Sequence, residues 1–167
     1  MRLANVQILE QHLIATYAGH HSDGRCVCAA LGFATEGFAL NAKQRELLAF
    51  SLPTLREPGS LLEMYARTDR TGSGGYNMGL SRRRLIAVQD VLIALGAPID
   101  KVRGVNCKAV GEQFEAYYGM EDDSSYAGGR AVWAFFWPSR AAFDEGPNDE
   151  QGFRKLTQFG RSFGWRL

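Results

Sequence analysis

The order of helix and strand signals is the feature that most constrains the fold of this chain. Two segments with helical apolar spacing, residues 42–56 and 77–95, each lie between short β-prone segments. The β-prone segments are residues 26–33, 60–68, 102–110 and 130–137. A strand–helix–strand unit returns its second strand parallel to the first by a right-handed crossover. The last strand follows a loop, so it can run antiparallel. The sequence predicts an α/β domain of order β-α-β-α-β-β, with a mixed sheet packed on helices.

The helix ends are marked by specific residues. Asn41 is a candidate N-cap with Gln44 three residues later, which is the pattern of a capping box. Pro58 and Gly59 end the first helix, which we expect from Ala42 to about Arg56. The second helix is expected from about Asn77 to Leu95, followed by Gly96 at the C′ position.

The two flanks are predicted as additions to this unit. Residues 3–17 have apolar side chains at amphipathic spacing and predict a helix, so residues 1–25 are expected to form an N-terminal helical extension. Residues 26–137 form the predicted domain. Residues 138–167 are expected to form a C-terminal extension packed on the same domain, with a short helix near Asp149–Phe159.

Composition excludes several classes of protein. The 167 residues suit one domain, and 19 Lys and Arg against 18 Asp and Glu leave a net charge of +1. That balance argues against a nucleic-acid partner, and 46% hydrophobic residues argue against disorder. We expect no membrane span and no signal peptide in this chain, which predicts a soluble domain.

The three cysteines leave two possibilities open. Cys26 and Cys28 lie two apart on one predicted strand, so they cannot easily pair with each other. One of them could pair with Cys107 if their strands are neighbours; three buried thiols are the favoured interpretation. His20 and His21 near these cysteines do not have clean zinc-ligand spacing, so no metal or cofactor is predicted.

The segment from Arg67 to Arg84 carries the main functional signal. Asp69 ends a predicted strand, a glycine-rich loop follows, and Arg84 lies about two turns into the next helix. Loops at strand ends of α/β sheets are favoured ligand positions. A carboxylate and a guanidinium around one loop suit a small zwitterion, because each binds the opposite charge.

This segment resembles the core motif of OmpA-like peptidoglycan-binding domains, which also occur in peptidoglycan-associated lipoproteins and flagellar stator proteins. The matching positions are Thr68, Asp69, Gly72, Tyr76, Asn77, Leu80, Ser81 and Arg84. The resemblance spans roughly residues 26–137, and it implies an OmpA-like fold without enzymatic activity.

The resemblance also implies roles for five residues. Asp69 would hold the ammonium of diaminopimelate in the peptidoglycan stem peptide, and Arg84 would hold the carboxylate at the same centre. Asn77 would shape the loop or cap the helix, and Thr68 belongs to the same motif. Arg130 would support the site at its edge.

The positions around this motif depart from the family pattern. Arg67 stands where the family has histidine, and Glu36 stands where it commonly has aspartate. Gly129 and Ala131 replace the asparagine and second arginine that usually flank Arg130.

Two interpretations of the charged residues remain open. Asp69 and Arg84 could form a structural ion pair, and a direct buried contact between them would favour that interpretation. Arg82 and Arg83 are expected on a solvated helix face. Arg130 could be an edge-strand charge without a binding role.

The predicted function is non-covalent binding of diaminopimelate-containing peptidoglycan, anchoring a parent protein or envelope assembly in the periplasm of a diderm bacterium. The expected location is outer-membrane-associated or within a larger envelope protein, and the absent export signal predicts a fragment or processed form. The alternative is a degenerate protein-interaction module of a secretion or envelope complex, with other envelope proteins as partners. A hydrolase that acts on the cell wall is disfavoured, because the sequence shows no recognisable nucleophile–base set and no catalytic carboxylate pair.

Overall fold

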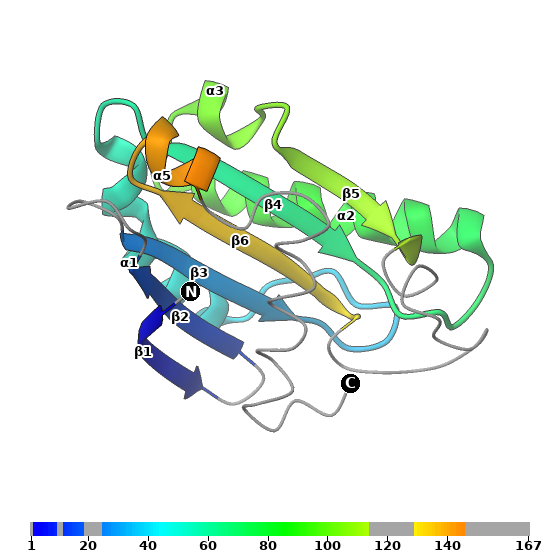
Figure 1. Cartoon of the computed structure of the whole chain (residues 1–167). Coiled ribbons are helices and arrows are strands. Elements are labelled where there is room, and N and C mark those ends of the chain that lie inside the picture. The colour runs from blue at the N-terminus through cyan, green and yellow to red at the C-terminus, as the bar shows by residue number, and fades with distance from the viewer. Residues whose placement is uncertain (1, 10–11, 19–24, 114–128, 146–167) are drawn as a thin grey trace.

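The structure is a computed structural model that describes residues 2–9, 12–18, 25–113 and 129–145. Its centre is a six-stranded sheet in the order β1-β2-β3-β6-β4-β5 (Figure 1). The strands are β1 Arg2–Leu9, β2 His12–Ala18, β3 Arg25–Gly32, β4 Leu61–Arg67, β5 Cys107–Gly111 and β6 Ala131–Trp137. The helices are α1 Ala42–Arg56, α2 Gly74–Ala94, α3 Ile99–Val102 and α5 Arg140–Glu145.

The sheet is mixed, as predicted. Strands β4 and β5 are parallel, whereas every other neighbouring pair is antiparallel. Strand β6 lies between β3 and β4 and is antiparallel to both, so β3 and β4 point the same way. The predicted order β-α-β-α-β-β is therefore confirmed for β3, α1, β4, α2, β5 and β6, with α3 as an addition before β5.

The helix predicted for residues 3–17 is wrong, because this segment forms the antiparallel strands β1 and β2. The same apolar residues also include pairs two positions apart, such as Val6 and Ile8, which is the spacing of a strand. A short apolar segment of this kind does not distinguish a helix from a strand. An isolated helix of this length is marginal in water. Pairing of β2 with β3 instead extends an existing sheet and satisfies the backbone of β2 on both edges.

The main core lies between one face of the sheet and helices α1 and α2, which run behind the sheet in Figure 1. Alternate residues of the central strands face it, because side chains on a strand change sides at every residue. These strand residues are Ala29, Leu31, Leu62, Met64, Ala66, Val132, Ala134 and Phe136. The helices contribute Leu47, Leu48, Leu52, Leu55, Leu85, Val88, Val91 and Leu92.

The helix boundaries show how local sequence signals act. Asn41 and Gln44 form the predicted capping box, with each side chain accepting from the other's backbone N–H at 2.9 Å. Gly96 has φ +91°, and the N–H of Ala97 donates to the carbonyl of Leu92 at 2.9 Å, which closes α2 as predicted. Helix α2 begins at Gly74, three residues before the predicted start.

Strand order separates the cysteines. Strands β6 and β4 lie between β3, which carries Cys26 and Cys28, and β5, which carries Cys107. Three strand spacings amount to roughly 14 Å, which is beyond the reach of a disulfide. Cys107 is a free thiol.

The predictions for the two flanks fall partly outside the described residues. Helix α5 begins the C-terminal extension, and the ring of Phe143 meets that of Trp137 edge-on at 6.1 Å between centroids. The helix predicted near Asp149–Phe159 and the histidine pair His20-His21 lie outside the described residues. None of the described helices is long and apolar enough to cross a membrane.

Candidate functional site

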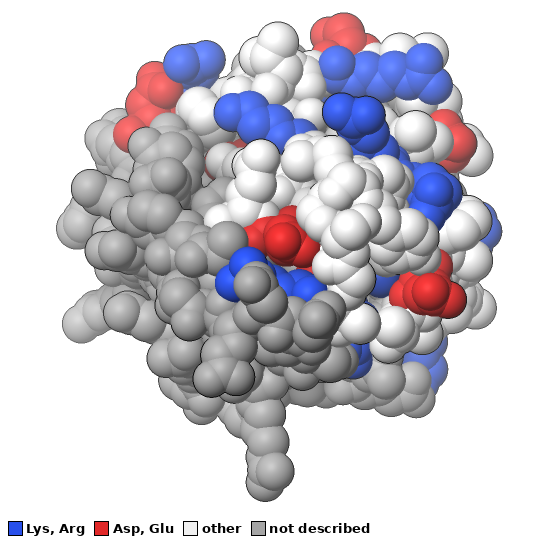
Figure 2. All heavy atoms as spheres, turned by 90° about the vertical axis from the view of Figure 1, so that its right-hand side faces the viewer, with Lys and Arg blue, Asp and Glu red and all other residues white. Residues whose placement is uncertain are grey.

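A cavity of about 380 Å³ lies where β4 ends and α2 begins. Its lining comes from the segment after β3, the loop after β4, α2, and the residue before β6. The lining residues are Thr35, Glu36, Asp69, Thr71, Gly72, Ser73, Tyr76, Asn77, Leu80, Arg84 and Arg130. Figure 2 shows acidic and basic side chains next to one another in the middle of the face at this end of the sheet.

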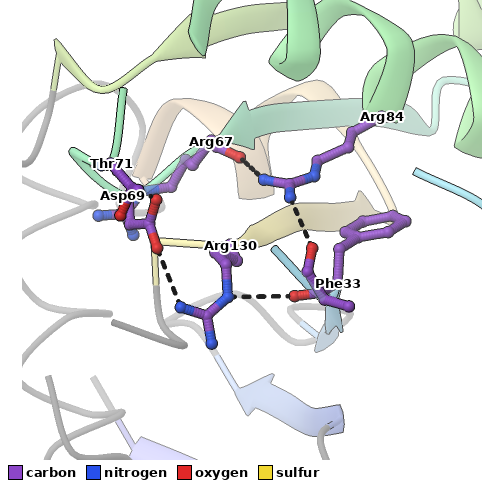
Figure 3. Close-up of polar contacts among 7 residues, drawn as sticks. Phe33, Arg67, Asp69, Thr71, Arg84 and Arg130 are labelled. Atoms are coloured by element: carbon purple, nitrogen blue, oxygen red, sulfur yellow. Dashed lines mark hydrogen bonds and ion pairs between the residues drawn. The ribbon is translucent and has the colours of Figure 1, made fainter. Parts of the chain in front are cut away.

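Asp69 is only 4% exposed, and both of its carboxylate oxygens have partners. Oδ2 forms an ion pair with Nη1 of Arg130 at 2.9 Å, and Oδ1 accepts the backbone N–H of Thr71 at 3.3 Å (Figure 3). Arg130 also donates from Nε to the carbonyl of Phe33 at 3.4 Å. Arg130 therefore crosses from Asp69 to the segment after β3, so it holds the two walls of the cavity together.

Arg84 is 0% exposed and binds three backbone carbonyls. Nε donates to Gly37 at 2.8 Å, Nη1 to Arg67 at 2.9 Å, and Nη2 to Ala34 at 3.1 Å. One side chain on α2 therefore joins the end of β4 to the loop after β3, and Figure 3 shows the guanidinium between these segments. A guanidinium has five N–H groups, so one remains on each terminal nitrogen for another acceptor.

Burial and the neighbouring charges together set the pKa of Arg84. Burial is the largest effect and lowers the pKa of Arg84 to about 10, while Asp69 raises it and Arg130 lowers it. The guanidinium therefore keeps its charge at neutral pH. The ring of Phe33, 5.2 Å from the guanidinium carbon, adds a cation–π contact.

Asp69 and Arg84 line the same cavity but do not form an ion pair among the described residues. The direct contact that would have favoured a structural pair is absent there, because Asp69 pairs with Arg130 instead. Two carboxylates, Glu36 and Asp69, and two guanidiniums, Arg84 and Arg130, line the cavity. Among the described lining residues the formal charges therefore balance, which suits a zwitterionic ligand.

Asn77 and Thr68 have different positions in this arrangement. Ser73, not Asn77, caps α2, and its Oγ accepts the N–H of Tyr76. Asn77 is buried in the cavity wall and donates from Nδ2 to Oε2 of Glu112 at 2.5 Å. Thr68 is buried and is not among the lining residues; its N–H donates to the carbonyl of Gly111 at 2.9 Å.

Gly111 explains how closely α2 approaches the sheet beside the site. It has φ +53°, and a Cβ there would lie 3.3 Å from the Cα and N of Met78 in α2. Its N–H donates to Oγ of Ser81 at 3.0 Å, and that hydroxyl donates to the carbonyl of Met78 at 2.9 Å. The motif serine therefore fixes α2, and with it Asn77 and Arg84, against β5.

Comparison of the sequence and the structure with known proteins identifies the fold of this chain. No family model matches the chain. Over 35 residues, 21% of this chain, it is 57% identical to outer membrane protein A of Escherichia fergusonii and of Shigella flexneri. That match covers 14% and 10% of these two proteins, so the chain aligns with only a small part of the relatives it matches.

Solved structures match over much more of the chain. The OmpA-like domain of FopA1 from Francisella tularensis subsp. tularensis SCHU S4 is 25% identical, with a TM-score of 0.56, covering 77% of this chain and 81% of that chain. The fold is OmpA-like. The peptidoglycan-associated lipoprotein of Burkholderia pseudomallei shares it at 18% identity and TM-score 0.52, covering 64% and 88%. The periplasmic domain of MotB does so at 13% identity and TM-score 0.51, covering 98% and 84%.

Two residues at the candidate site are not among the binding residues predicted from sequence. Glu36 lines the cavity with φ +61°, which few residues other than glycine adopt. The sequence signal for Glu36 is its match to the position where the family commonly has aspartate, since both side chains are carboxylates. Glu112, the partner of Asn77, lies 35 residues away along the chain, and no local pattern joins them.

Proposed function

We propose that this OmpA-like domain binds bacterial cell-wall peptidoglycan non-covalently, through the diaminopimelate of the stem peptide, and so anchors a parent protein or envelope assembly. The observation that carries the proposal is a cavity whose described lining residues include two carboxylates and two guanidiniums. The free end of diaminopimelate has one ammonium and one carboxylate on the same carbon, so it matches such a lining. A polyanion would fit this cavity poorly, because Glu36 and Asp69 would repel its negative charges.

The roles follow from the atoms that remain available. The ligand ammonium would bind Asp69 at Oδ1, whose contact with the Thr71 N–H is long at 3.3 Å. The ligand carboxylate would accept the remaining N–H groups of Arg84. Arg130 would keep Asp69 in position from the other side at 2.9 Å. Peptidoglycan built on lysine lacks the carboxylate that Arg84 would bind.

The proposed location is the periplasm, at the outer membrane or within a larger envelope protein. The names of the matched proteins support it, since they include an outer membrane protein, a peptidoglycan-associated lipoprotein and a periplasmic domain. OmpA-like domains of these kinds are non-enzymatic, in agreement with the prediction from sequence.

A second candidate is a protein-interaction module within an envelope complex. The observation that favours it is that the key charges already have internal partners. Asp69 is paired with Arg130, and Arg84 binds three backbone carbonyls. In that case the charges would hold the loops together, and the wall would not be a ligand.

Retention on purified sacculi tests the proposal. The wild type is compared with Asp69→Asn, which keeps the shape of the side chain, and with Arg84→Lys, which keeps the charge. Matched controls are Asp144→Asn and Arg82→Lys, since both residues are exposed and lie outside the cavity lining. Circular dichroism verifies that each variant is folded.

The expected result is retention of the wild type and both controls on diaminopimelate-type sacculi, with affinity reduced roughly tenfold or more in each site variant, the size of one charged hydrogen bond. Lysine-type sacculi should retain the wild type poorly. No retention of the folded wild type on either wall would overturn the proposal and leave the interaction module.

A further inference from the structure

Arg83 lies between two exposed aromatic rings beside the cavity. Its guanidinium carbon is 5.6 Å from the ring centroid of Phe38 and 5.9 Å from that of Tyr76. Phe38 is 45% exposed and Tyr76 is 42% exposed, so burial in the hydrophobic core does not explain the position of either ring. We call these three residues the aromatic–arginine rim.

The aromatic–arginine rim borders the cavity. Tyr76 belongs to both, because it lines the cavity and also contacts Arg83. Tyr76 and Arg83 are seven residues apart on α2, about two turns, so they share one face of the helix. Phe38 comes from the segment after β3, next to Gly37, whose carbonyl binds Arg84. A ligand leaving the cavity past Tyr76 would therefore meet Arg83.

The charge of Arg83 is available to such a ligand. Within the part of the chain that the structure describes, Arg83 contacts the two rings and forms no ion pair. Stacking between the rings restricts the rotamers of a long side chain that otherwise loses much conformational entropy when a ligand orders it. Neighbouring Arg82 is also exposed, and has no ring or carboxylate partner among the described residues. Arg83 is therefore pre-ordered for an anion in a way that Arg82 is not.

We propose that the aromatic–arginine rim binds a second carboxylate of the same stem peptide, the free α-carboxylate of the γ-linked glutamate joined to diaminopimelate. This inference rests on the proposed function. The glutamate is adjacent to diaminopimelate in the stem peptide, and its free α-carboxylate has the charge complementary to Arg83. The rings of Phe38 and Tyr76 would contact its methylene groups. The rim would thus distinguish walls with free glutamate from walls in which this carboxylate is amidated.

A matched pair of soluble peptides tests the rim directly. The probes are L-alanyl-γ-D-glutamyl-diaminopimelate and the same tripeptide with the glutamate α-carboxylate amidated. Binding to wild type, Arg83→Gln, Arg82→Gln and Phe38→Leu is measured by calorimetry at low salt. The wild type should prefer the acid by about threefold to tenfold, the range expected for a partly exposed charge pair. Arg83→Gln should lose this preference, Phe38→Leu should reduce it, and Arg82→Gln should keep it.

The outcomes separate the two proposals. Equal binding of acid and amide by the wild type, or an unchanged preference in Arg83→Gln, overturns the rim while leaving peptidoglycan binding intact. Failure of the wild type to bind either peptide and to be retained on sacculi overturns both. A preference that falls as salt is raised supports a charge contact, because screening weakens it.

Discussion

Replacing Arg84 with lysine should destabilise the fold even though the charge is retained. The guanidinium reaches carbonyls of Ala34, Gly37 and Arg67 with three different nitrogens. An ammonium is a single point at the end of a flexible chain, so it cannot span all three. If two of the three hydrogen bonds are lost at about 1 kcal/mol each or slightly more, the cost is roughly 2 to 3 kcal/mol in the free energy of unfolding. For a chain of this size that lowers the melting temperature by roughly 5 to 10 °C.

Urea unfolding followed by tryptophan fluorescence measures this effect, because Trp133 and Trp137 are buried in β6 and change environment on unfolding. Arg82→Lys is the matched control on the same helix and should stay within about 0.5 kcal/mol of wild type. If Arg84→Lys is as stable as Arg82→Lys, the three carbonyl contacts do not hold α2 to the loops that form the cavity walls.

Gly111→Ala should cost roughly 1 to 3 kcal/mol, because φ is positive there and the new methyl group would meet the backbone of Met78; an unchanged melting temperature would show that α2 can move away. Asn41→Ala should cost about 1 kcal/mol by removing the capping box with Gln44, whereas Glu46→Ala, at an exposed position of the same helix outside the box, should be close to neutral in the same calorimetric melt. Burial raises the pKa of Cys107 from 9.0 to about 12, so the unfolded state loses this proton first and stability should fall between pH 9 and 12. Cys107→Ala should flatten that part of the curve, and parallel curves would contradict the assignment.

The candidate site was predictable where the chain keeps its residues close together. Asp69, Asn77 and Arg84 lie within one strand–loop–helix passage, so their spacing placed three cavity-lining residues on adjacent elements. Local signals also set the helix ends, because a capping box and a C′ glycine act through hydrogen bonds between near neighbours. The alternation of helix and strand signals likewise predicted a mixed sheet, but it did not predict that β6 lies between β3 and β4.

Tertiary structure alone decided the partners of these residues. Asp69 pairs with Arg130, which is 61 positions away in the sequence, and Arg84 binds carbonyls 47 and 50 positions away. These residues meet because β6 lies between β3 and β4, which brings the ends of the three strands together. The N-terminal segment shows the same limit. Its apolar spacing permits a helix or strands, and the free edge of β3 decides the outcome, because it provides backbone partners that no local pattern contains.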